Sequence, residues 1–206
     1  MTNVASEENK ALSVRGTLIV DVAQKLFFKH GFDETSLAMI INETGGSRRS
    51  IYDDFGNKQG LLIAVINRQL NKQTEMLSTI NRKLSPEDAL NDVCFRFSQG
   101  MLSETLISLH RLVVQQVVKL PELGEMIFER GPMKGVHTLA EYLDELATQG
   151  ELVITDAHFS AQMLLEMSKA PLHTRSLLLP NNFASDDEIA TQVAKVVNIF
   201  LKAHTK

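Results

Sequence analysis

The amino-acid sequence predicts an all-α protein. Apolar residues recur every three or four positions through most of the chain, as at Leu18, Val22 and Leu26, which is the pattern of helices that bury one face. Helix-stop signals separate these stretches, such as the pair His30 and Gly31. Strand-like alternation is confined to the segment "ELVIT". The 206 residues suffice for one large domain or two small ones with a sizeable core.

The first part of the chain predicts three helices of unequal length. A long helix ends at the His-Gly pair 30–31, and a short second helix follows, capped by Thr35 or Ser36. The Thr-Gly-Gly sequence 44–46 ends that helix. A third short helix begins after the cap Ser47, within "SRRSIYDDF".

The rest of the chain also predicts helices. A long fourth helix begins at the cap Asn57, and its apolar positions continue to Leu84. A serine cap, a proline and two acids at 85–88 then mark the start of another helix. The further helices are expected at about 86–102, 104–119, 121–149 with a break at Gly131-Pro132, 156–169 and 187–203.

The two short helices and the glycine turn form the helix-turn-helix arrangement, because they follow a longer helix. In that arrangement the second short helix enters the major groove of DNA and presents its first residues to the base edges. Those residues here are Ser47, Arg48, Arg49 and Ser50. The N–H groups at the start of such a helix attract phosphate, and arginine pairs through two hydrogen bonds with guanine. The alternative for the two arginines is a solvated charge pair.

At this stretch the chain resembles the N-terminal domain of the TetR/AcrR family of transcriptional regulators. The matching segment is "AQKLFFKHGFDETSLAMIINETGGSRRSIYDDFGNKQGLLIAVI", in which the "GF", "TSL", "IY" and "NK" elements follow in the family's order and spacing. The resemblance implies a helix-turn-helix DNA-binding domain over residues 1–56. It also implies a larger helical domain for effector binding and dimerisation over residues 57–206, joined to the first domain by a long helix.

The resemblance further implies roles for single residues. It implies phosphate contacts for Tyr52 and Lys58, and either Thr35 or Ser36 can cap a helix and contact phosphate at once. The chain departs from the family pattern at Ile41, Gly46, Arg49 and Asp54, which bears on the turn geometry and on the approach to phosphate. The expected DNA-binding residues are Thr35, Ser36, Ser47, Arg48, Arg49, Ser50, Tyr52 and Lys58.

Charge restricts how this chain can bind DNA. The formal net charge is −4, which argues against coating nucleic acid by bulk electrostatics. Residues 1–60 contain seven Lys and Arg against eight Asp and Glu, so the first domain has no basic excess. Affinity for DNA must therefore come from geometry and a few placed cations.

Other classes of function find little support. The single cysteine, Cys94, cannot form an intrachain disulfide, and no signal-peptide core or run of about 18 apolar residues is present, so we expect a cytoplasmic protein without membrane association. The six histidines lack metal-ligand spacing, so we expect no metal. No catalytic or cofactor motif appears, so we expect neither an enzyme nor a cofactor.

The helical body is expected to hold a small, apolar effector. Bulky or polarisable side chains on otherwise apolar helix faces are candidates for the pocket lining, between the fourth helix and the helices from 86 to about 170. The residues chosen on that ground are Phe97, Met101, His110 and Met167. Core filling is the alternative role for the methionines.

The last helix predicts a homodimer, because its apolar arc between Glu188 and Ala203 is much wider than the roughly 100° of a surface helix. The surplus suggests a core contact on one side and a second subunit on the other. The alternative is a helix buried within one chain. The residues expected at the dimer interface are Ile189, Val193, Val196, Val197 and Phe200.

Together these features predict a homodimeric, ligand-responsive regulator of transcription, a repressor. It would bind a pseudo-palindromic operator in double-stranded DNA and be released by a small molecule. The alternative is an all-helical small-molecule-binding protein or enzyme with a vestigial helix-turn-helix. A third possibility is a DNA-binding family member that acts on another protein. A gel shift on the DNA flanking its own gene separates the first two.

Overall fold

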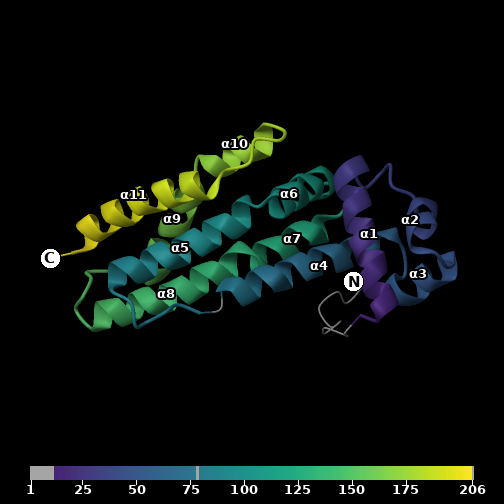
Figure 1. Cartoon of the computed structure of the whole chain (residues 1–206). Helices are drawn as coiled ribbons and strands as arrows, with labels where there is room; N and C mark the ends of the chain where they lie inside the picture. The colour runs from purple at the N-terminus through teal and green to yellow at the C-terminus, as the bar shows by residue number, and fades with distance from the viewer. Residues whose placement is uncertain (1–11, 78, 206) are drawn as a thin grey trace. The chain divides into compact units, whose positions relative to one another are not determined.

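The computed structural model describes residues 12–77 and 79–205 and contains eleven helices within them (Figure 1). No strand occurs in these ranges. The helices are α1 (Val14–His30), α2 (Leu37–Thr44), α3 (Arg48–Phe55), α4 (Lys58–Leu77), α5 (Pro86–Leu102), α6 (Glu104–Gln116), α7 (Pro121–Arg130), α8 (Pro132–Thr148), α9 (Ala157–Lys169), α10 (Leu172–Leu178) and α11 (Asp186–His204).

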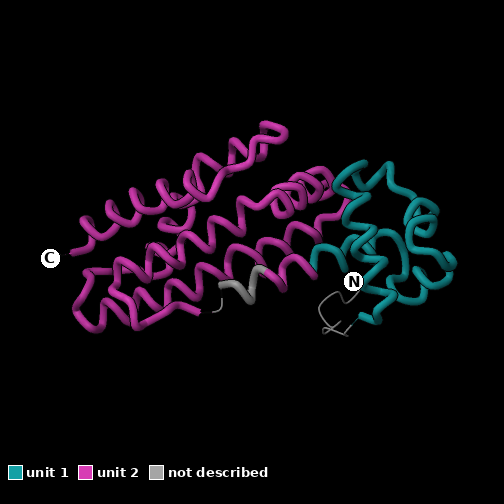
Figure 2. The backbone as a smooth tube through the Cα atoms, in the orientation of Figure 1, with its two compact units in different colours: residues 1–67 teal, residues 68–206 magenta. Residues whose placement is uncertain are grey.

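The chain divides into two compact units, Met1–Asn67 and Arg68–Lys206 (Figure 2). The boundary falls inside α4 rather than after residue 56, where the sequence predicted it. The first half of α4 belongs to unit 1, where it contributes fully buried side chains such as Leu61 and Ile66. Unit 1 therefore includes the start of the long helix.

Unit 1 is built on α1, which packs against α2, and α2 in turn contacts α3. Ser13 caps α1 by accepting a hydrogen bond from the backbone N–H of Gly16 at 2.9 Å. Each of the three helices contributes buried apolar side chains, so burial of these faces fixes the helices on one another. The buried apolar residues of α1–α3 are Ile19, Val20, Ala23, Leu26, Phe27, Ile40 and Ile51.

Unit 2 has one hydrophobic core, to which α5, α8, α9 and α11 contribute most of the buried side chains. In Figure 1, α11 lies along α5, and the same two helices are in contact in the structure. Ser85 caps α5 ahead of Pro86, as the sequence predicted, and Ser103 both ends α5 and caps α6. The predicted break at Gly131-Pro132 separates α7 from α8.

The structure differs from the predicted helices in two places. The fourth helix was expected to continue to Leu84, but α4 ends at Leu77, and residues 79–84 are not helical. The sequence analysis also missed α10, a seven-residue helix between Pro171 and Pro180. Seven residues are too few to show a helical period, so the pattern of apolar residues does not reveal this element.

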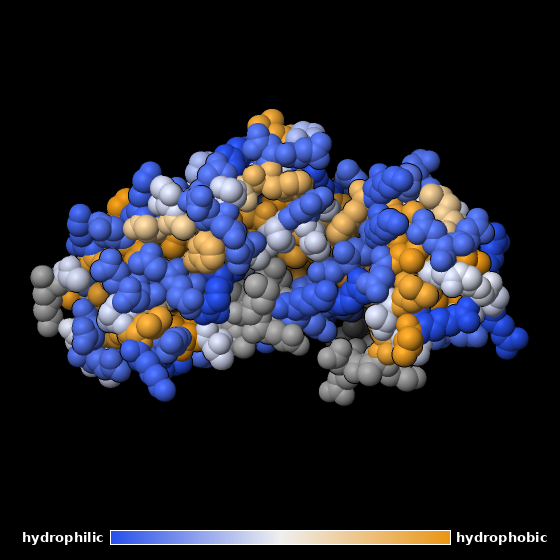
Figure 3. Space-filling model, in the orientation of Figure 1, coloured by the Kyte–Doolittle hydropathy of each residue, from blue (hydrophilic) through white to orange (hydrophobic). Residues whose placement is uncertain are grey.

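Figure 3 shows one face of the molecule, on which hydrophilic side chains predominate and hydrophobic ones form small groups. This distribution is ordinary for a protein surface. No helix in the described part of the chain is long and apolar enough to cross a membrane.

Candidate nucleic-acid interface

The turn between α2 and α3 is built from two glycines. Ser36 caps α2, and its hydroxyl accepts a hydrogen bond from the N–H of Met39 at 3.2 Å. The helix ends at Gly45, with φ 70°, and Gly46 follows with φ 97°. Both values lie in a region that residues with a Cβ rarely adopt, so these glycines set the angle between the two helices. The predicted helix-turn-helix is confirmed.

The third helix has one buried and one exposed side. Ile51 is 1% exposed and anchors α3 in the core of unit 1. Arg48 and Arg49, in the first turn, are exposed, and Tyr52 is 53% exposed. Three of the predicted DNA-binding residues therefore lie on the exposed side of this helix.

The two arginines of α3 differ in their surroundings. Arg49 Nε lies 3.6 Å from Asp53 Oδ2, an exposed ion pair across one helical turn. Such exposed pairs contribute little and are easily exchanged for another partner. Arg48 has no carboxylate partner within the described residues. Its guanidinium is thus the less restrained of the two.

The two serines at the start of α3 lie close together. Ser47 occupies the N-cap position, as predicted, but its side chain makes no capping hydrogen bond. Its Oγ lies 3.4 Å from the Oγ of Ser50. Ser47 is exposed and Ser50 partly so, which leaves both hydroxyls beside the arginine-bearing turn.

Of the two serine or threonine candidates before α2, only one is at the surface. Thr35 is fully buried, and its hydroxyl donates to the carbonyl oxygens of Leu26 at 3.2 Å and Gly31 at 2.8 Å. Thr35 therefore ties the end of α1 to the next segment. Because its side chain is buried, the phosphate contact predicted for Thr35 is wrong. Ser36 is exposed, so it can cap α2 and still donate outward.

The ammonium of Lys58 is engaged within the protein. Its Nζ donates to the carbonyl oxygens of Phe32 at 2.8 Å and Thr35 at 2.9 Å, with Asp33 at 3.3 Å. The same atom lies 4.4 Å from the centroid of the Phe32 ring, a cation–π contact. An ammonium has three donors. Lys58 thus holds the segment between α1 and α2 against the start of α4, where the sequence predicted a phosphate contact.

A residue that the sequence analysis missed lies beside the turn. Arg15, in the first turn of α1, donates from Nη2 to the carbonyl oxygen of Gly45 at 3.3 Å. The two residues are 30 positions apart, so no local pattern could reveal the contact. In the sequence, only the departure from the family pattern at Gly46 was related to this contact.

The predicted effector residues in unit 2 are dispersed. Phe97 is buried in the core, and Met101 packs against it. Met167 is 38% exposed, on the outer side of α9. His110 faces His173, with Nδ1 of the first 3.3 Å from Nε2 of the second. The four residues do not line one cavity that the structure describes.

The two histidines form a partly buried polar pair between α6 and α10. Burial lowers the pKa of His110, and the nearby Lys169 ammonium lowers it further. Burial also lowers the pKa of His173 to about 4, with contributions from Lys169 and His110. Both rings are neutral at pH 7, so one can donate to the other. Arg111, next to His110, donates to the carbonyl oxygens of Ser176 at 2.6 Å and Leu177 at 3.0 Å. These contacts fix α10 on α6.

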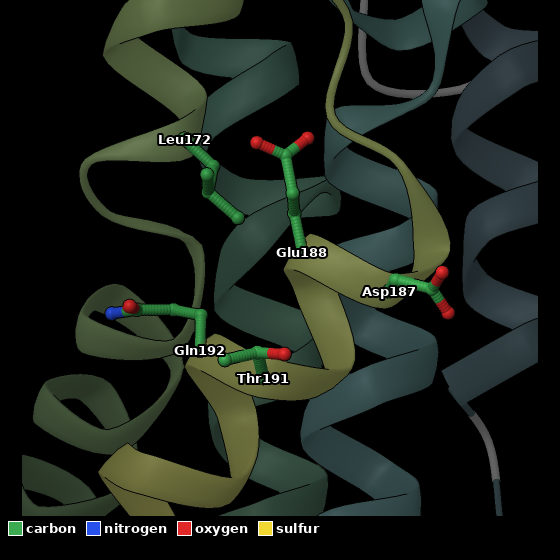
Figure 4. Close-up of a pocket in the computed structure, with 5 residues that line it drawn as sticks. All are labelled: Leu172, Asp187, Glu188, Thr191 and Gln192. Atoms are coloured by element: carbon green, nitrogen blue, oxygen red, sulfur yellow. The ribbon is translucent and has the colours of Figure 1, made fainter.

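Two open pockets lie on the surface of the described part of unit 2. One, of about 310 Å³, lies between the starts of α10 and α11 (Figure 4). Its lining residues are Leu172, Asp187, Glu188, Thr191 and Gln192. The other, of about 480 Å³, lies where α5 begins and α11 ends. None of the four residues predicted to line an effector pocket lines either one. Within residues 12–77 and 79–205, no three His, Cys, Asp or Glu side chains come close enough together to hold a metal ion.

The residues predicted at the dimer interface lie in the core instead. The five residues are Ile189, Val193, Val196, Val197 and Phe200, and none is more than 8% exposed. The wide apolar arc of α11 is covered by α5 and α9 of the same unit, which explains the surplus of apolar residues. The alternative interpretation, burial within one chain, holds for these side chains. Ile199 is a large apolar residue of the same helix that is exposed.

Two family models match this chain. The C-terminal domain of AefR-like transcriptional repressors matches residues 88–206, and the tetR family of bacterial regulatory proteins matches residues 19–65. The chain is 42% identical over 53 residues to the HTH-type transcriptional repressor ComR of Escherichia coli (strain K12). That alignment covers 26% of this chain and only 25% of ComR.

Solved structures share the fold over nearly the whole chain. A protein described as a TetR-family transcriptional regulator from Mesorhizobium loti MAFF303099 matches with a TM-score of 0.84 at 20% identity, covering 96% of this chain and 100% of that one. The flavonoid-responsive regulator FrrA matches with a TM-score of 0.77 at 21% identity, covering 93% of this chain and 97% of FrrA.

Proposed function

The chain belongs to the TetR family of bacterial regulatory proteins, and on that premise we propose that it is a ligand-responsive repressor that binds operator DNA as a homodimer. The activity is binding rather than catalysis. Because its target is the bacterial chromosome, we place it in the cytoplasm.

The observation that carries the proposal is the two-sided α3. Ile51 fixes the helix in unit 1, while Arg48, Arg49 and Tyr52 remain exposed beside a two-glycine turn. A helix presented in this way fits the major groove with its first turn toward the bases. Arg48 is the base reader in this proposal, because Arg49 has Asp53 as a partner. Tyr52 and Ser36 supply phosphate contacts.

The homodimer would form through the outer sides of α9 and α11. Phe159, Met163 and Met167 follow one another at intervals of four residues on α9, so they share one helix face, and all three are exposed. Ile199 is exposed on α11, which contacts α9. A two-fold axis there would pair each helix with its copy and place two α3 helices on half-sites about 34–36 Å apart, or a multiple of that spacing.

The effector site belongs to unit 2. FrrA is a flavonoid-responsive regulator, which supports a small-molecule effector for a chain of the same fold. We place recognition of the effector near the His110–His173 pair, where neutral ring nitrogens lie next in the chain to Leu172, which packs against the apolar core. The ligand class is a small, mainly apolar molecule with one group that makes a hydrogen bond. Its binding would shift the equilibrium toward the form with lower operator affinity.

Fluorescence anisotropy with the DNA that flanks the protein's own gene tests the proposal. Arg48→Ala should lose operator preference over random DNA by about 5- to 150-fold for each half-site, the effect of one lost base contact of roughly 1–3 kcal/mol. Lys83→Ala removes an exposed cation of unit 2 and serves as the control. If neither Arg48→Ala nor Arg49→Ala changes operator preference, α3 does not read bases. If the wild-type chain binds no DNA specifically, the proposed function fails.

A further inference from the structure

We propose that Arg15 is a DNA-phosphate ligand, held beside the recognition helix by the glycine turn that joins α2 to α3. The inference rests on the proposed function and adds to it a contact from α1. It assigns a purpose to Gly46 as well, since that residue leaves room for the guanidinium.

The position of Arg15 is fixed both at its backbone and at the end of its side chain. Ser13 caps α1 just ahead of it, which fixes the first turn of the helix. At the far end of the side chain, Nη2 donates to the carbonyl oxygen of Gly45 at 3.3 Å. The guanidinium therefore lies on the turn, although Arg15 and the turn are 30 positions apart in the sequence.

Gly46 is required by this arrangement. A Cβ built on Gly46 would lie 1.4 Å from Nη2 and 2.7 Å from Cζ of Arg15, so any side chain there would displace the guanidinium. The backbone φ of 97° independently disfavours other residues. The turn is thus shaped to accept an arginine side chain over its surface.

The guanidinium still has donors to offer. It has five N–H groups and uses one of them on Gly45. Arg15 is exposed, and among residues 12–77 and 79–205 it has no carboxylate partner. Arg48 begins α3 two residues after Gly46, so a second unneutralised cation lies a few residues along the same turn. A DNA backbone phosphate satisfies the remaining donors and the charge of Arg15, because guanidinium groups bind phosphate in a fork.

Gly45 also ends α2, so the alternative role for Arg15 is to cap the negative end of that helix without binding DNA. The two roles differ in their response to salt. A phosphate ligand adds about 0.9 to the slope of log affinity against log salt for each phosphate neutralised. A helix cap contributes to unfolding stability and leaves the slope unchanged.

The test measures operator and random-DNA affinity at several salt concentrations. In a dimer two copies of Arg15 act, so Arg15→Ala should reduce the slope by about two and weaken both DNAs to a similar extent. Arg15→Lys keeps the charge and should keep most of the slope. Lys29→Ala removes an exposed cation from the last turn of the same helix and should leave the slope as in the wild type.

Two results would overturn the inference. One is an unchanged slope for Arg15→Ala, whether or not its urea stability falls, and the other is an equal fall of slope for Lys29→Ala. The proposed function is judged separately by Arg48→Ala. If Arg48→Ala loses operator preference while Arg15→Ala binds like the wild type, only the present inference fails.

Discussion

The two units of this regulator place their cations differently. Two ion pairs of unit 1 are long and exposed, with Lys25 Nζ 3.9 Å from Glu43 and Arg49 Nε 3.6 Å from Asp53. Four ion pairs of unit 2 are short and join or brace helices. The unit 2 pairs are Arg82–Glu145 at 2.6 Å, Arg96–Asp92 at 2.8 Å, Lys169–Glu166 at 2.6 Å and Arg175–Glu188 at 2.7 Å.

This difference separates two uses of charge. The short ion pairs of unit 2 hold helices such as α10 and α11 in one arrangement. For example, Arg175 of α10 makes two hydrogen bonds to Glu188 of α11. The DNA-binding unit leaves arginines loosely paired at its surface, where a phosphate or a base can engage them. An unpaired charge is useful on α3 and would be harmful in the core of unit 2.

The largest expected effect comes from placing an unpaired charge in that core. Val197 is fully buried on α11, so Val197→Asp should lower the free energy of unfolding by at least 3–5 kcal/mol and leave unit 2 unfolded or insoluble. Ile199→Asp lies two residues away on the same helix but is 58% exposed, so this variant should fold normally. Urea unfolding followed by circular dichroism compares the two.

Ile199→Asp also tests the dimer surface, together with Phe159→Asp on α9. Ile199→Asp and Phe159→Asp should remain folded and shift toward monomers in light scattering, because each puts charge on the proposed interface. Two fully dimeric variants would place the interface elsewhere. A stable, soluble Val197→Asp would contradict the burial of that side chain.

A smaller effect is expected at Lys58, which binds to carbonyl oxygens of unit 1 and so, like the paired cations of unit 2, braces the structure from within. Lys58→Met leaves three carbonyl oxygens without their donor and should lower the stability of unit 1 by about 1–3 kcal/mol. The salt slope of DNA binding should change little. Lys29→Met, which removes an exposed lysine, is the control for the loss of charge. A reduced salt slope with unchanged stability would instead support the phosphate contact that the sequence predicted for Lys58.

Much of the fold could be predicted because helix ends carry local chemical signals. The limits of α5 match the structure because Ser85 and Pro86 are adjacent in sequence and act within one turn. The Gly-Pro pair at 131–132 likewise predicts the break between α7 and α8. The exposed arginines of α3 follow from its short length and from the buried Ile51.

The rest depends on contacts between distant parts of the chain. The side chains of Lys58 and Arg15 donate to backbone carbonyl oxygens 23 and 30 positions away. Every residue has such a carbonyl, so the sequence cannot show which one accepts the hydrogen bond. A wide apolar arc on α11 shows how much surface is buried but not whether the cover comes from the same chain. Here α5 and α9 supply it. The short α10 is held by polar contacts, which hydrophobic periodicity cannot detect.

The smallest expected effect concerns pH and the neutral histidine pair of the body. An unfolded histidine has a pKa of about 6.5, whereas the pKa of folded His173 is about 4. The unfolded chain therefore binds more protons between these values, and stability should fall as the pH drops from 6.5 toward 4. Above pH 6.5 the contribution is constant. Because the ring is only partly buried, we expect about 1–2 kcal/mol rather than the full equivalent of the pKa difference.

His173→Gln should remove this dependence without introducing a charge. Carboxylates also titrate in acid, so the measured quantity is the difference between the wild type and the variant in urea stability from pH 7 to pH 4.5. Burial is the main cause of the low pKa of His173, and the nearby groups that also act on this pKa are Lys169, His110 and Glu166. Removal of the exposed His30 by His30→Gln should leave the wild-type pH dependence in place. Parallel pH profiles for His173→Gln and the wild type would mean that the pair is as easily protonated in the folded body as in water, and that unit 2 tolerates a charge beside Lys169.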